Sequence, residues 1–425
     1  MRPLEKVALQ PARELTAGMV STRFAGTDGV TLEAAKLGEV LADAGHRVAW
    51  FAGELGERFT PGRLHASAHF ESEENRDLEA ACFGVATRSP ATTALIRERT
   101  EELKVALRGF LGDFGVDLVV AQNVLCLPMQ LPLGLALTEV LVEQGLPVLA
   151  HHHDFWWERE RFFPNAVADV LGAAFPPVLE RMAHLVINSG AARELARRRA
   201  VEATVLPNVM DFERGPRRPG DGARYRKAAG LAPDDVLLLQ PTRVVPRKWI
   251  EATIDLAGRL PGAGGPPVTV AITHAEGDEG RDYGARLRAQ AERLGVDLRF
   301  VPAGVGDPDG PDLADAYAAA DLVCFPSVWE GFGNALLEAF FHRRPVLVNR
   351  YQVYADDIAP TGVRCIELDG EVTPEAVAQV RDLLASPDQA AAMVEANYQA
   401  SLRHFSYATV RERVLPLVDR LTIPA

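Results

Sequence analysis

Short runs of apolar residues recur along the chain, and most are followed by a stretch with the spacing of an amphipathic helix. Short apolar runs are typical of buried strands, and their alternation with helices indicates parallel sheets covered by helices on both faces. The strands expected in the first half are residues 47–52, 117–121, 147–151, 184–188 and 204–206. Those expected in the second half are residues 236–239, 268–272, 298–301, 322–326 and 346–349.

The glycines and irregular segments between these elements predict two domains. Gly45 and Gly295 each follow a helical stretch, where a left-handed C-cap glycine is expected. Residues 211–222, DFERGPRRPGDG, lack apolar periodicity and are predicted to be a linker, whereas residues 303–311 are expected to form a surface loop in the second domain.

The predicted fold is therefore α/β, with two doubly wound parallel-sheet domains. We expect an N-terminal domain of residues 1–212, a second domain of residues 213–400, and a C-terminal helix in residues 401–425 that returns to the first domain. Ligands of such sheets bind at the carboxyl ends of the strands, so a cleft between the domains is the expected site.

Length and composition agree with this organisation. A chain of 425 residues is too long for one compact core. Hydrophobic residues make up 48% and charged residues 24%, which excludes collagen, coiled coils and intrinsic disorder. The net charge of −13 disfavours nucleic acid and anionic lipid as partners.

The cysteines and the apolar segments bear on location. The four cysteines are far apart, with no CxxC pair and no histidine at zinc-ligand spacing, so we expect reduced thiols in a cytoplasmic protein; they are Cys82, Cys126, Cys324 and Cys365. Residues 1–12 have no apolar segment of signal-peptide length. Residues 124–142 are apolar but are interrupted by Pro128, Gln130 and Pro132, whereas a membrane-spanning helix needs about 20 nearly unbroken apolar residues. We expect a buried loop and helix there, and no stable membrane insertion.

The most informative segment is residues 321–341, DLVCFPSVWEGFGNALLEAFF, in which a buried strand leads into a glycine-bearing turn and then a helix. The glycines let the backbone approach a ligand, and the N–H groups of a helix that starts near Asn334 form an anion site. Glu330 and Glu338 lie beside it and are able to accept hydrogen bonds from sugar hydroxyls. A phosphate on the amides and hydroxyls on the carboxylates together describe a nucleotide sugar.

Two alternatives apply to this segment. The two glutamates are also explained by solubility and by dipole complementation at a helix end. Gly331-Phe332-Gly333 begins like the dinucleotide fingerprint GxGxxG, but Leu336 occupies the third glycine position and no second fingerprint lies near the N-terminus, so NAD is not expected.

Two basic residues follow the expected strand 236–239. A guanidinium and an ammonium at the carboxyl end of a strand suit a diphosphate, because they neutralise the charge that grows on a departing phosphate oxygen; here they are Arg243 and Lys248. The alternative is a solvated basic turn.

Taken together, these residues resemble a known family. The order Arg243, Lys248 and Glu330-x7-Glu338, with the flanking EGFGNALLEA, resembles the retaining glycosyltransferases of family 4, which have the GT-B fold of two Rossmann-like domains. Among them, enzymes that make sucrose phosphate and glycerate-based solutes are similar. The resemblance extends over most of the chain, including Gly26-Thr27-Asp28-Gly29, His153-Asp154 and Pro207-Asn208-Val209 with Asp211.

The resemblance implies roles for individual residues. Arg243 and Lys248 would bind the donor diphosphate, and Glu338 would bind the nucleotide ribose. Glu330 and the backbone of the glycine turn would hold the transferred sugar and the phosphates. The implied donor set also includes Gly29, Gly331, Phe332, Gly333, Asn334 and Ala335. In such enzymes the departing phosphate takes the acceptor proton, so neither a protein nucleophile, a metal nor a cofactor is expected.

The first domain supplies the remaining candidates. Asp28, in a glycine-bearing loop that leads into a helix, is a candidate for contact with sugar or acceptor hydroxyls, although a plain tight turn also explains the loop. Residues 151–154 end a strand, so His151 and His153 share one face and His152 lies on the other. Zinc is a minority interpretation. The resemblance favours His153 for the donor sugar or the reacting oxygens, and His152 is assigned to the acceptor.

Two clusters of arginines follow. Residues 155–163, FWWERERFF, are expected to form a helix with aromatic side chains in the core; in the alternative, Arg159 or Arg161 binds an acidic group of the acceptor. The basic stretch 191–199 is more typical of a solvated helix face than of a site for a phosphorylated or lipid-linked acceptor. We therefore expect a small, soluble acceptor.

The sequence thus predicts a cytoplasmic, retaining, metal-independent glycosyltransferase. It would move a hexose from a nucleoside diphosphate sugar, UDP- or GDP-linked, to a hydroxyl of a small polar acceptor, acidic ones included, with no nucleic-acid partner. A nucleotide-sugar epimerase of the same architecture and a non-catalytic nucleotide-sugar binding protein are the alternatives. The base, the sugar, the acceptor, the linkage and the oligomeric state carry no local signature.

Overall fold

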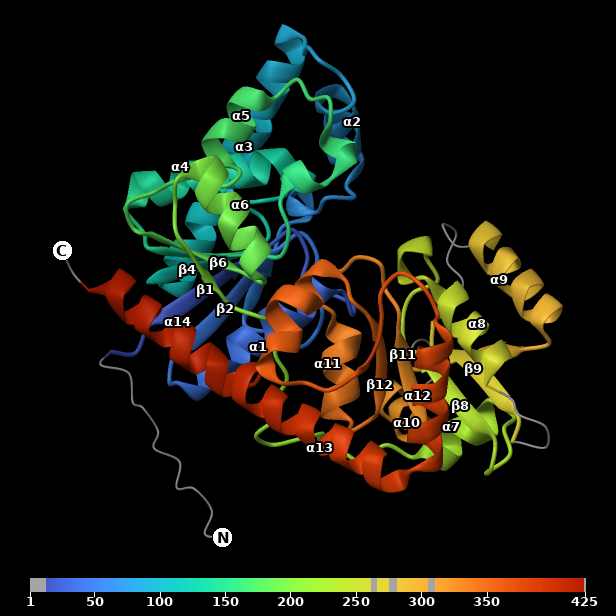
Figure 1. Ribbon diagram of the computed structural model, residues 1–425. Coiled ribbons are helices and arrows are strands. Elements are labelled where there is room, and N and C mark those ends of the chain that lie inside the picture. The colour runs from blue at the N-terminus through green and yellow to red at the C-terminus, as the bar shows by residue number, and fades with distance from the viewer. Residues whose placement is uncertain (1–12, 261–265, 275–280, 305–309, 424–425) are drawn as a thin grey trace. The chain divides into compact units, whose positions relative to one another are not determined.

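A computed structural model describes residues 13–423 except 261–265, 275–280 and 305–309 (Figure 1). The chain divides into two compact units, Met1–Pro207 with Ala408–Ala425, and Asn208–Tyr407. Each unit is built around one parallel sheet with helices on its faces, which confirms the predicted fold class.

The first unit contains a seven-stranded sheet of order β3-β2-β1-β4-β5-β6-β7. Its strands are β1 Thr16–Val20, β2 Arg47–Ala52, β3 Gly62–Leu64, β4 Leu118–Gln122, β5 Val148–His152, β6 Met182–Val186 and β7 Ala203–Val205. Its helices are α1 Gly29–Asp43, α2 Glu73–Cys82, α3 Pro90–Phe114, α4 Leu131–Gln144, α5 Ala168–Ala174, α6 Ser189–Arg199 and nearly all of α14 Tyr407–Thr422.

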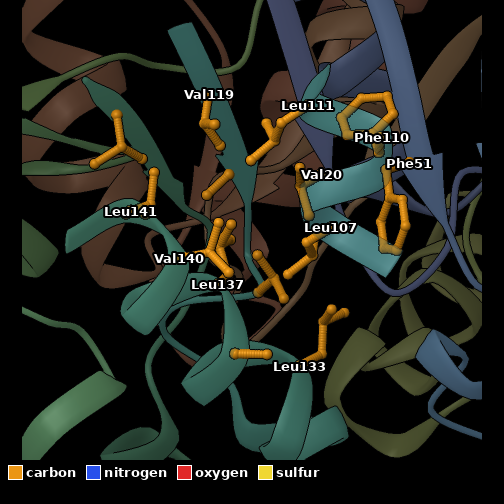
Figure 2. Close-up of a cluster of buried hydrophobic side chains, with 14 of the residues drawn as sticks. Val20, Phe51, Leu107, Phe110, Leu111, Val119, Leu133, Leu137, Val140 and Leu141 are labelled. Atoms are coloured by element: carbon orange, nitrogen blue, oxygen red, sulfur yellow. The ribbon is translucent and has the colours of Figure 1, made fainter. Parts of the chain in front are cut away.

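Helices α3 and α4 cover one face of this sheet and bury an extensive apolar cluster against it (Figure 2). In α4 the apolar side chains recur at Leu133, Leu137, Val140 and Leu141, the spacing of one helix face. Each is at most 2% exposed, and burying such a side chain contributes about 1.5–3 kcal/mol. The expected buried loop and helix in residues 124–142 are therefore confirmed.

Among the described residues, none of the helices combines the length and apolar character needed to cross a membrane.

The second unit contains a six-stranded sheet of order β10-β9-β8-β11-β12-β13. Its strands are β8 Val236–Gln240, β9 Val268–Ile272, β10 Asp297–Phe300, β11 Leu322–Phe325, β12 Val346–Asn349 and β13 Ile366–Leu368. Its helices are α7 Gly222–Ala228, α8 Ile250–Arg259, α9 Arg281–Leu294, α10 Leu313–Ala319, α11 Asn334–Phe341, α12 Pro374–Ala385 and α13 Pro387–His404.

Each sheet has one point at which the strand order reverses. In the first sheet β1 lies between β2 and β4, and in the second sheet β8 lies between β9 and β11. At such a switch point the connections leave in opposite directions, so the loops after the two central strands diverge and leave a crevice. The loops after β1 and β4, and those after β8 and β11, are therefore the places where a ligand is expected.

Every strand expected from the sequence is present, with ends that differ by at most two residues. Gly45 and Gly295 follow α1 and α9 with φ of 90° and 66°, as expected for C-cap glycines. Strands β1, β3 and β13 were not predicted. In β1 the central Gly18 weakens the apolar pattern, and the space a side chain would need is filled by Val116, whose Cγ1 lies 2.9 Å from an ideal Cβ.

Two expectations for irregular segments are corrected. The segment 211–222 belongs to the second unit, where Arg218 donates to Asp315 and Asp221 caps α7, so it is not a free linker. Residues 155–163 form two short 3-10 turns, Trp156–Glu158 and Glu160–Phe162, in place of the expected helix. Of the predicted loop 303–311, residues 305–309 lie outside the described residues.

Candidate functional site

The loops after β8 and β11 bring a buried ion pair to the switch point of the second sheet. Lys248, in a 3-10 turn after β8, donates from Nζ to Glu330 Oε1, and Arg247 Nη1 donates to Glu330 Oε2 at 2.8 Å. The two loops are also joined by their backbones, since Val328 N donates to Arg247 O at 2.9 Å. Lys248 and Glu330 are each 8% exposed. The structure therefore joins one basic and one acidic candidate that lie far apart in the sequence.

This cluster carries an excess of positive charge. Burial lowers the pKa of Lys248, and the charges of Arg247 and Arg243 add to the effect against the attraction of Glu330. Burial by itself would raise the pKa of Glu330, but Lys248 and Arg247 outweigh it and hold that pKa below its ordinary value. Two cations thus contact one carboxylate, and the charge of a third, Arg243, reaches Lys248. A diphosphate is a natural further partner, because partly buried charges attract each other strongly.

Arg243 lies in the same loop and is exposed. Its charge reaches His274, two residues after β9: burial, then Arg243 and Lys248, lower the pKa of that imidazole. His274 is therefore neutral at pH 7, and its Nδ1 lies 3.0 Å from Thr273 Oγ1. The carboxyl ends of β8, β9 and β11 together present a mixed set of charged and neutral polar groups.

The glycine turn before α11 has a conformation that only glycine fits well. Gly333 has a φ of 125°, and an ideal Cβ there would lie 2.5 Å from Tyr351 Oη. Tyr351 Oη in turn donates to Phe332 O at 2.6 Å, so the tyrosine holds the turn. The helix starts at Asn334, as expected, and its N-cap residue is Gly333, which has no side chain to cap it. Its first N–H groups are suited to an anion.

Neighbouring residues fix the start of α11. Asn334 Oδ1 accepts from Asn208 Nδ2 at 2.5 Å, and Asn208 is 6% exposed. Gly331, Asn334 and Ala335 are partly exposed, whereas Phe332 and Gly333 are buried. The backbone of this turn is therefore held rigidly, with some of its members open to a ligand.

Glu338 lies one turn into α11 and is partly buried. Its Oε2 accepts from Tyr317 Oη at 2.9 Å, and the same hydroxyl lies 3.1 Å from Ala335 O. Burial and the Glu338 charge raise the pKa of Tyr317, so this phenol stays protonated. A carboxylate held in this way on a helix is a suitable acceptor for hydroxyls of a ribose.

In the first unit, Asp28 caps α1. Its Oδ1 accepts from Thr31 N at 3.0 Å, and its Oδ2 accepts from Thr31 Oγ1 at 2.8 Å and from Arg23 Nη2 at 3.1 Å. The side chain is 35% exposed, so one edge of the carboxylate faces outward. Gly29 is the exposed first residue of α1, and Gly26 has a φ of 73°. The structural alternative for this loop is therefore present, with Asp28 as the cap of α1, a role that the sequence analysis did not name.

The histidines at the end of β5 divide between the two faces of the sheet, as predicted. The rings of His151 and His153 lie 4.3 Å apart, and both approach Gln122 Oε1, His151 Nδ1 at 3.1 Å and His153 Nε2 at 3.4 Å. His152 Nε2 instead lies 3.0 Å from His184 Nδ1. His152 is only 1% exposed, so the structure does not bring this proposed acceptor residue to the surface.

These imidazoles are neutral at pH 7. Burial, and then the charge of Lys36, lower the pKa of His153 to about 3, and burial lowers the pKa of His184 to about 4. His153 is therefore a hydrogen-bonding group and not a cation. Among the described residues, no group of three or more His, Cys, Asp or Glu side chains is placed to hold a metal.

Arg159 is bound within the protein. Both its Nε, at 2.6 Å, and its Nη2 donate to Asp154 Oδ2. Asp154 Oδ1 accepts from Asn123 Nδ2 at 3.1 Å, and Asn123 Oδ1 accepts from His153 N at 2.9 Å. This series of hydrogen bonds positions the backbone of His153. Arg159 therefore acts on the histidine through its neighbours, and the structure gives no support to an acceptor contact.

Arg161 and the basic helix α6 are also bound to nearby carboxylates. Arg161 Nη2 lies 3.3 Å from Glu79 Oε1. In α6, Glu194 Oε2 accepts from Arg197 at 2.8 Å and from Arg198 at 2.9 Å, as expected for a solvated face.

Several residues at these sites were not identified from the sequence. They are Arg247, His274, Tyr317, Gln122 and Asn123. Gln122 is the last residue of β4 and His274 comes two residues after β9, so their position just after a predicted strand was an available signal. Tyr317, inside a short helix, offered none.

Comparison with known proteins gives a consistent result. The family model described as "Glycosyl transferases group 1" matches residues 221–400. The mannosylglucosylglycerate synthase of Thermotoga maritima is 32% identical over 427 residues, which cover 93% of this chain and 97% of that protein.

Solved structures with low sequence identity share the fold. HepE from Anabaena, crystallised with UDP and glucose, has a TM-score of 0.66 at 16% identity and covers 96% of this chain and 100% of its own. The sucrose-phosphate synthase of Thermosynechococcus elongatus has a TM-score of 0.65 at 15% identity, with coverage of 96% and 99%. These likenesses identify the fold as GT-B.

Proposed function

The chain belongs to the group 1 glycosyltransferases, and from that premise we propose that it transfers a hexose from a nucleoside diphosphate sugar to a hydroxyl group of a small polar acceptor. The observation that carries the proposal is the cluster of Arg243, Arg247, Lys248 and Glu330 beside the uncapped start of α11. Three cations and a row of helix N–H groups suit a diphosphate, and the carboxylates suit sugar hydroxyls.

In the proposed reaction the bond between the sugar C1 and the diphosphate oxygen breaks. A bond forms between C1 and the acceptor oxygen on the same face, so the anomeric configuration is retained. The acceptor proton passes to the departing phosphate oxygen, and the products are a glycoside and a nucleoside diphosphate. Arg243, Arg247 and Lys248 stabilise the charge that grows on the leaving group, which is the contribution that a metal ion would otherwise supply.

The remaining residues would bind and orient the substrates. Glu338, with Tyr317 holding one of its oxygens, would accept from the ribose hydroxyls. Glu330 and the backbone of the turn at Gly333 would hold the sugar and the phosphates. Neutral His153 would form a hydrogen bond with the sugar or with the reacting oxygens.

The relative from Thermotoga maritima is a synthase of mannosylglucosylglycerate. Its name supports a hexose donor and a glycerate glycoside as the first acceptor to test, and the UDP and glucose bound to HepE support UDP-sugars as one arm of the donor panel. A cytoplasmic location is part of the same proposal, because the four cysteines are free thiols.

Two measurements test the proposal. Thermal unfolding in the presence of UDP-, GDP- and ADP-hexoses would identify the donor, since a ligand of the native state raises the melting temperature. The chosen donor is then incubated with glycerate glycosides, and proton NMR of the product reports the new anomeric bond. Formation of a product with retained configuration supports the proposal. Release of an epimerised sugar without acceptor, or donor binding without any turnover, would replace it with the epimerase or the binding protein.

A further inference from the structure

A cavity lies at the switch point of the first sheet, at the carboxyl ends of β1 and β4. Residues just after β1, including Arg23, and Gln122 and Asn123 at the end of β4 line it, together with Phe70 and Met129. Its own volume is about 120 Å³, smaller than the roughly 300–1,000 Å³ that is usual for a complete small-molecule site, and it opens to solvent. The cavity therefore has room for the acidic end of a small acceptor, and the rest of that molecule would extend out of it.

Arg23 is the one cation among the described residues that line this cavity. Its guanidinium lies 5.1 Å from the centre of the Phe70 ring and donates from Nη2 to Asp28 Oδ2 at 3.1 Å. Asp28 is itself fixed by the backbone and hydroxyl of Thr31. These contacts hold the plane of the guanidinium and use one of its five N–H groups, so it retains the paired donors that bind an oxyanion.

Gln122 supplies a second polar group to the same cavity. Its side chain is fully buried, and its Oε1 accepts from both His151 and His153. Its Nε2, however, has no hydrogen-bond partner in the described part of the chain. A buried amide N–H without an acceptor is costly, and a hydroxyl of a bound ligand would satisfy it. The same side chain touches His153, so a ligand at Gln122 lies next to the proposed reacting group.

We propose that this cavity binds the acceptor and that Arg23 binds a carboxylate of the acceptor, while Gln122 binds one of its hydroxyls. The inference rests on the proposed function and specifies its acceptor. The charge balance favours a monoanion, because a single guanidinium already shares its charge with Asp28, which would repel a dianionic phosphate. Arg159 and Arg161, the arginines considered first, are bound to Asp154 and Glu79.

Two acceptors that differ only in the acidic group test this inference. A glucosylglycerate carries a carboxylate where the matching glucosylglycerol carries CH2OH. Arg23→Ala is expected to lower kcat/KM for the glycerate compound by about 10- to 150-fold, the range of a charge-assisted hydrogen bond, and by less than about threefold for the glycerol compound. Arg23→Lys keeps the charge without the paired donors, so its kcat/KM for the glycerate compound is expected to lie between those of the wild type and Arg23→Ala.

Arg58→Ala is the matched control. Arg58 is an exposed arginine of the same unit whose guanidinium lies 4.7 Å from the Phe59 ring, and it does not line the cavity. Its removal is expected to leave both acceptors unchanged. The affinity of each variant for UDP and GDP, measured by calorimetry, is expected to equal that of the wild type.

Three outcomes would overturn the inference. Equal losses on the two acceptors would show a merely structural effect of Arg23. Equal kcat/KM of the wild type for the two acceptors would show that the carboxylate is not recognised. If calorimetry detects no binding of glucosylglycerate to the wild type, glycerate glycosides are excluded as acceptors. In each case the proposed function stands if the nucleoside diphosphate still binds and sugar is still transferred to another hydroxyl, and it fails only if neither occurs.

Discussion

Lys248→Met removes the ammonium from the proposed diphosphate site and keeps an unbranched side chain of similar length. In the wild type, Nζ bonds to Glu330 and lies 5.2 Å from the centre of the Phe325 ring. Methionine preserves the contact with the ring, so the change acts mainly on charge. Arg247 still bonds to Glu330 in the variant, so this carboxylate keeps a partner. The loss of stability is therefore expected to lie below the roughly 3–5 kcal/mol that follows when a buried pair loses one member.

The expected loss of affinity follows from the charges at the site. Arg243, Arg247 and Lys248 outnumber the one carboxylate, Glu330, so the excess of two positive charges falls to one in the variant. A charge-assisted hydrogen bond to phosphate contributes about 1.5–3 kcal/mol, which corresponds to a Kd for the nucleoside diphosphate that is about 10- to 150-fold higher. Because part of this is attraction between charges, the difference from the wild type should shrink as salt is added.

Lys104→Met is the control. Lys104 lies in the first unit, its side chain is 7% exposed, and it pairs with Glu101, Glu139 and Glu143. Its replacement removes another ammonium on a little-exposed side chain and should reduce stability without changing nucleotide affinity. Calorimetric titration of UDP and GDP into both variants separates the two effects. A Kd for Lys248→Met within twofold of the wild type would refute the assignment of Lys248 to the diphosphate.

Three further predictions concern other parts of the structure. Glu330→Gln should lower kcat by about 100-fold or more while the circular dichroism spectrum is retained, because a charge at the reacting centre is lost; wild-type turnover would contradict this. Gly333→Ala should destabilise the second unit by about 1–3 kcal/mol, since its φ is 125° and its Cβ would meet Tyr351, whereas Gly112→Ala on open helix α3 should be neutral or stabilising; equal denaturation midpoints would contradict the strain. Burial lowers the pKa of His184 to about 4 in the folded protein, so on acidification the unfolded chain takes up a proton at this imidazole first. The free energy of unfolding should therefore fall by about 3 kcal/mol in all as the pH drops from about 6.5 towards 4. Urea unfolding of His184→Gln should show a weaker dependence of stability on pH, and a dependence equal to that of the wild type would contradict this prediction.

The fold was largely predictable because its strands are buried on both faces. Runs such as β9 Val268–Ile272 and β12 Val346–Asn349 are continuous apolar segments, and their ends were predicted to the residue. Strand β1 has a comparable position at the centre of its sheet but contains Gly18, whose missing side chain is replaced by Val116 and Phe110 from elsewhere. No local pattern records a contribution of that kind.

The candidate residues were predictable where a short motif holds several of them together. The turn at Gly333 and the two glutamates around it stand within nine residues, and the structure pairs one of these glutamates, Glu330, with another candidate, Lys248. Contacts that arise only when the chain folds could not be predicted from such a motif. Arg159 was considered for the acceptor because it follows the histidines, and only the structure places Asp154 against it.

A crystal structure of the protein with its nucleoside diphosphate bound is the decisive test of the proposed donor site. We expect the diphosphate oxygens to lie within hydrogen-bonding distance of Arg243, Lys248 and the first N–H groups of α11, with the ribose hydroxyls at Glu338. A nucleotide whose phosphates lie away from these groups would refute the proposed site.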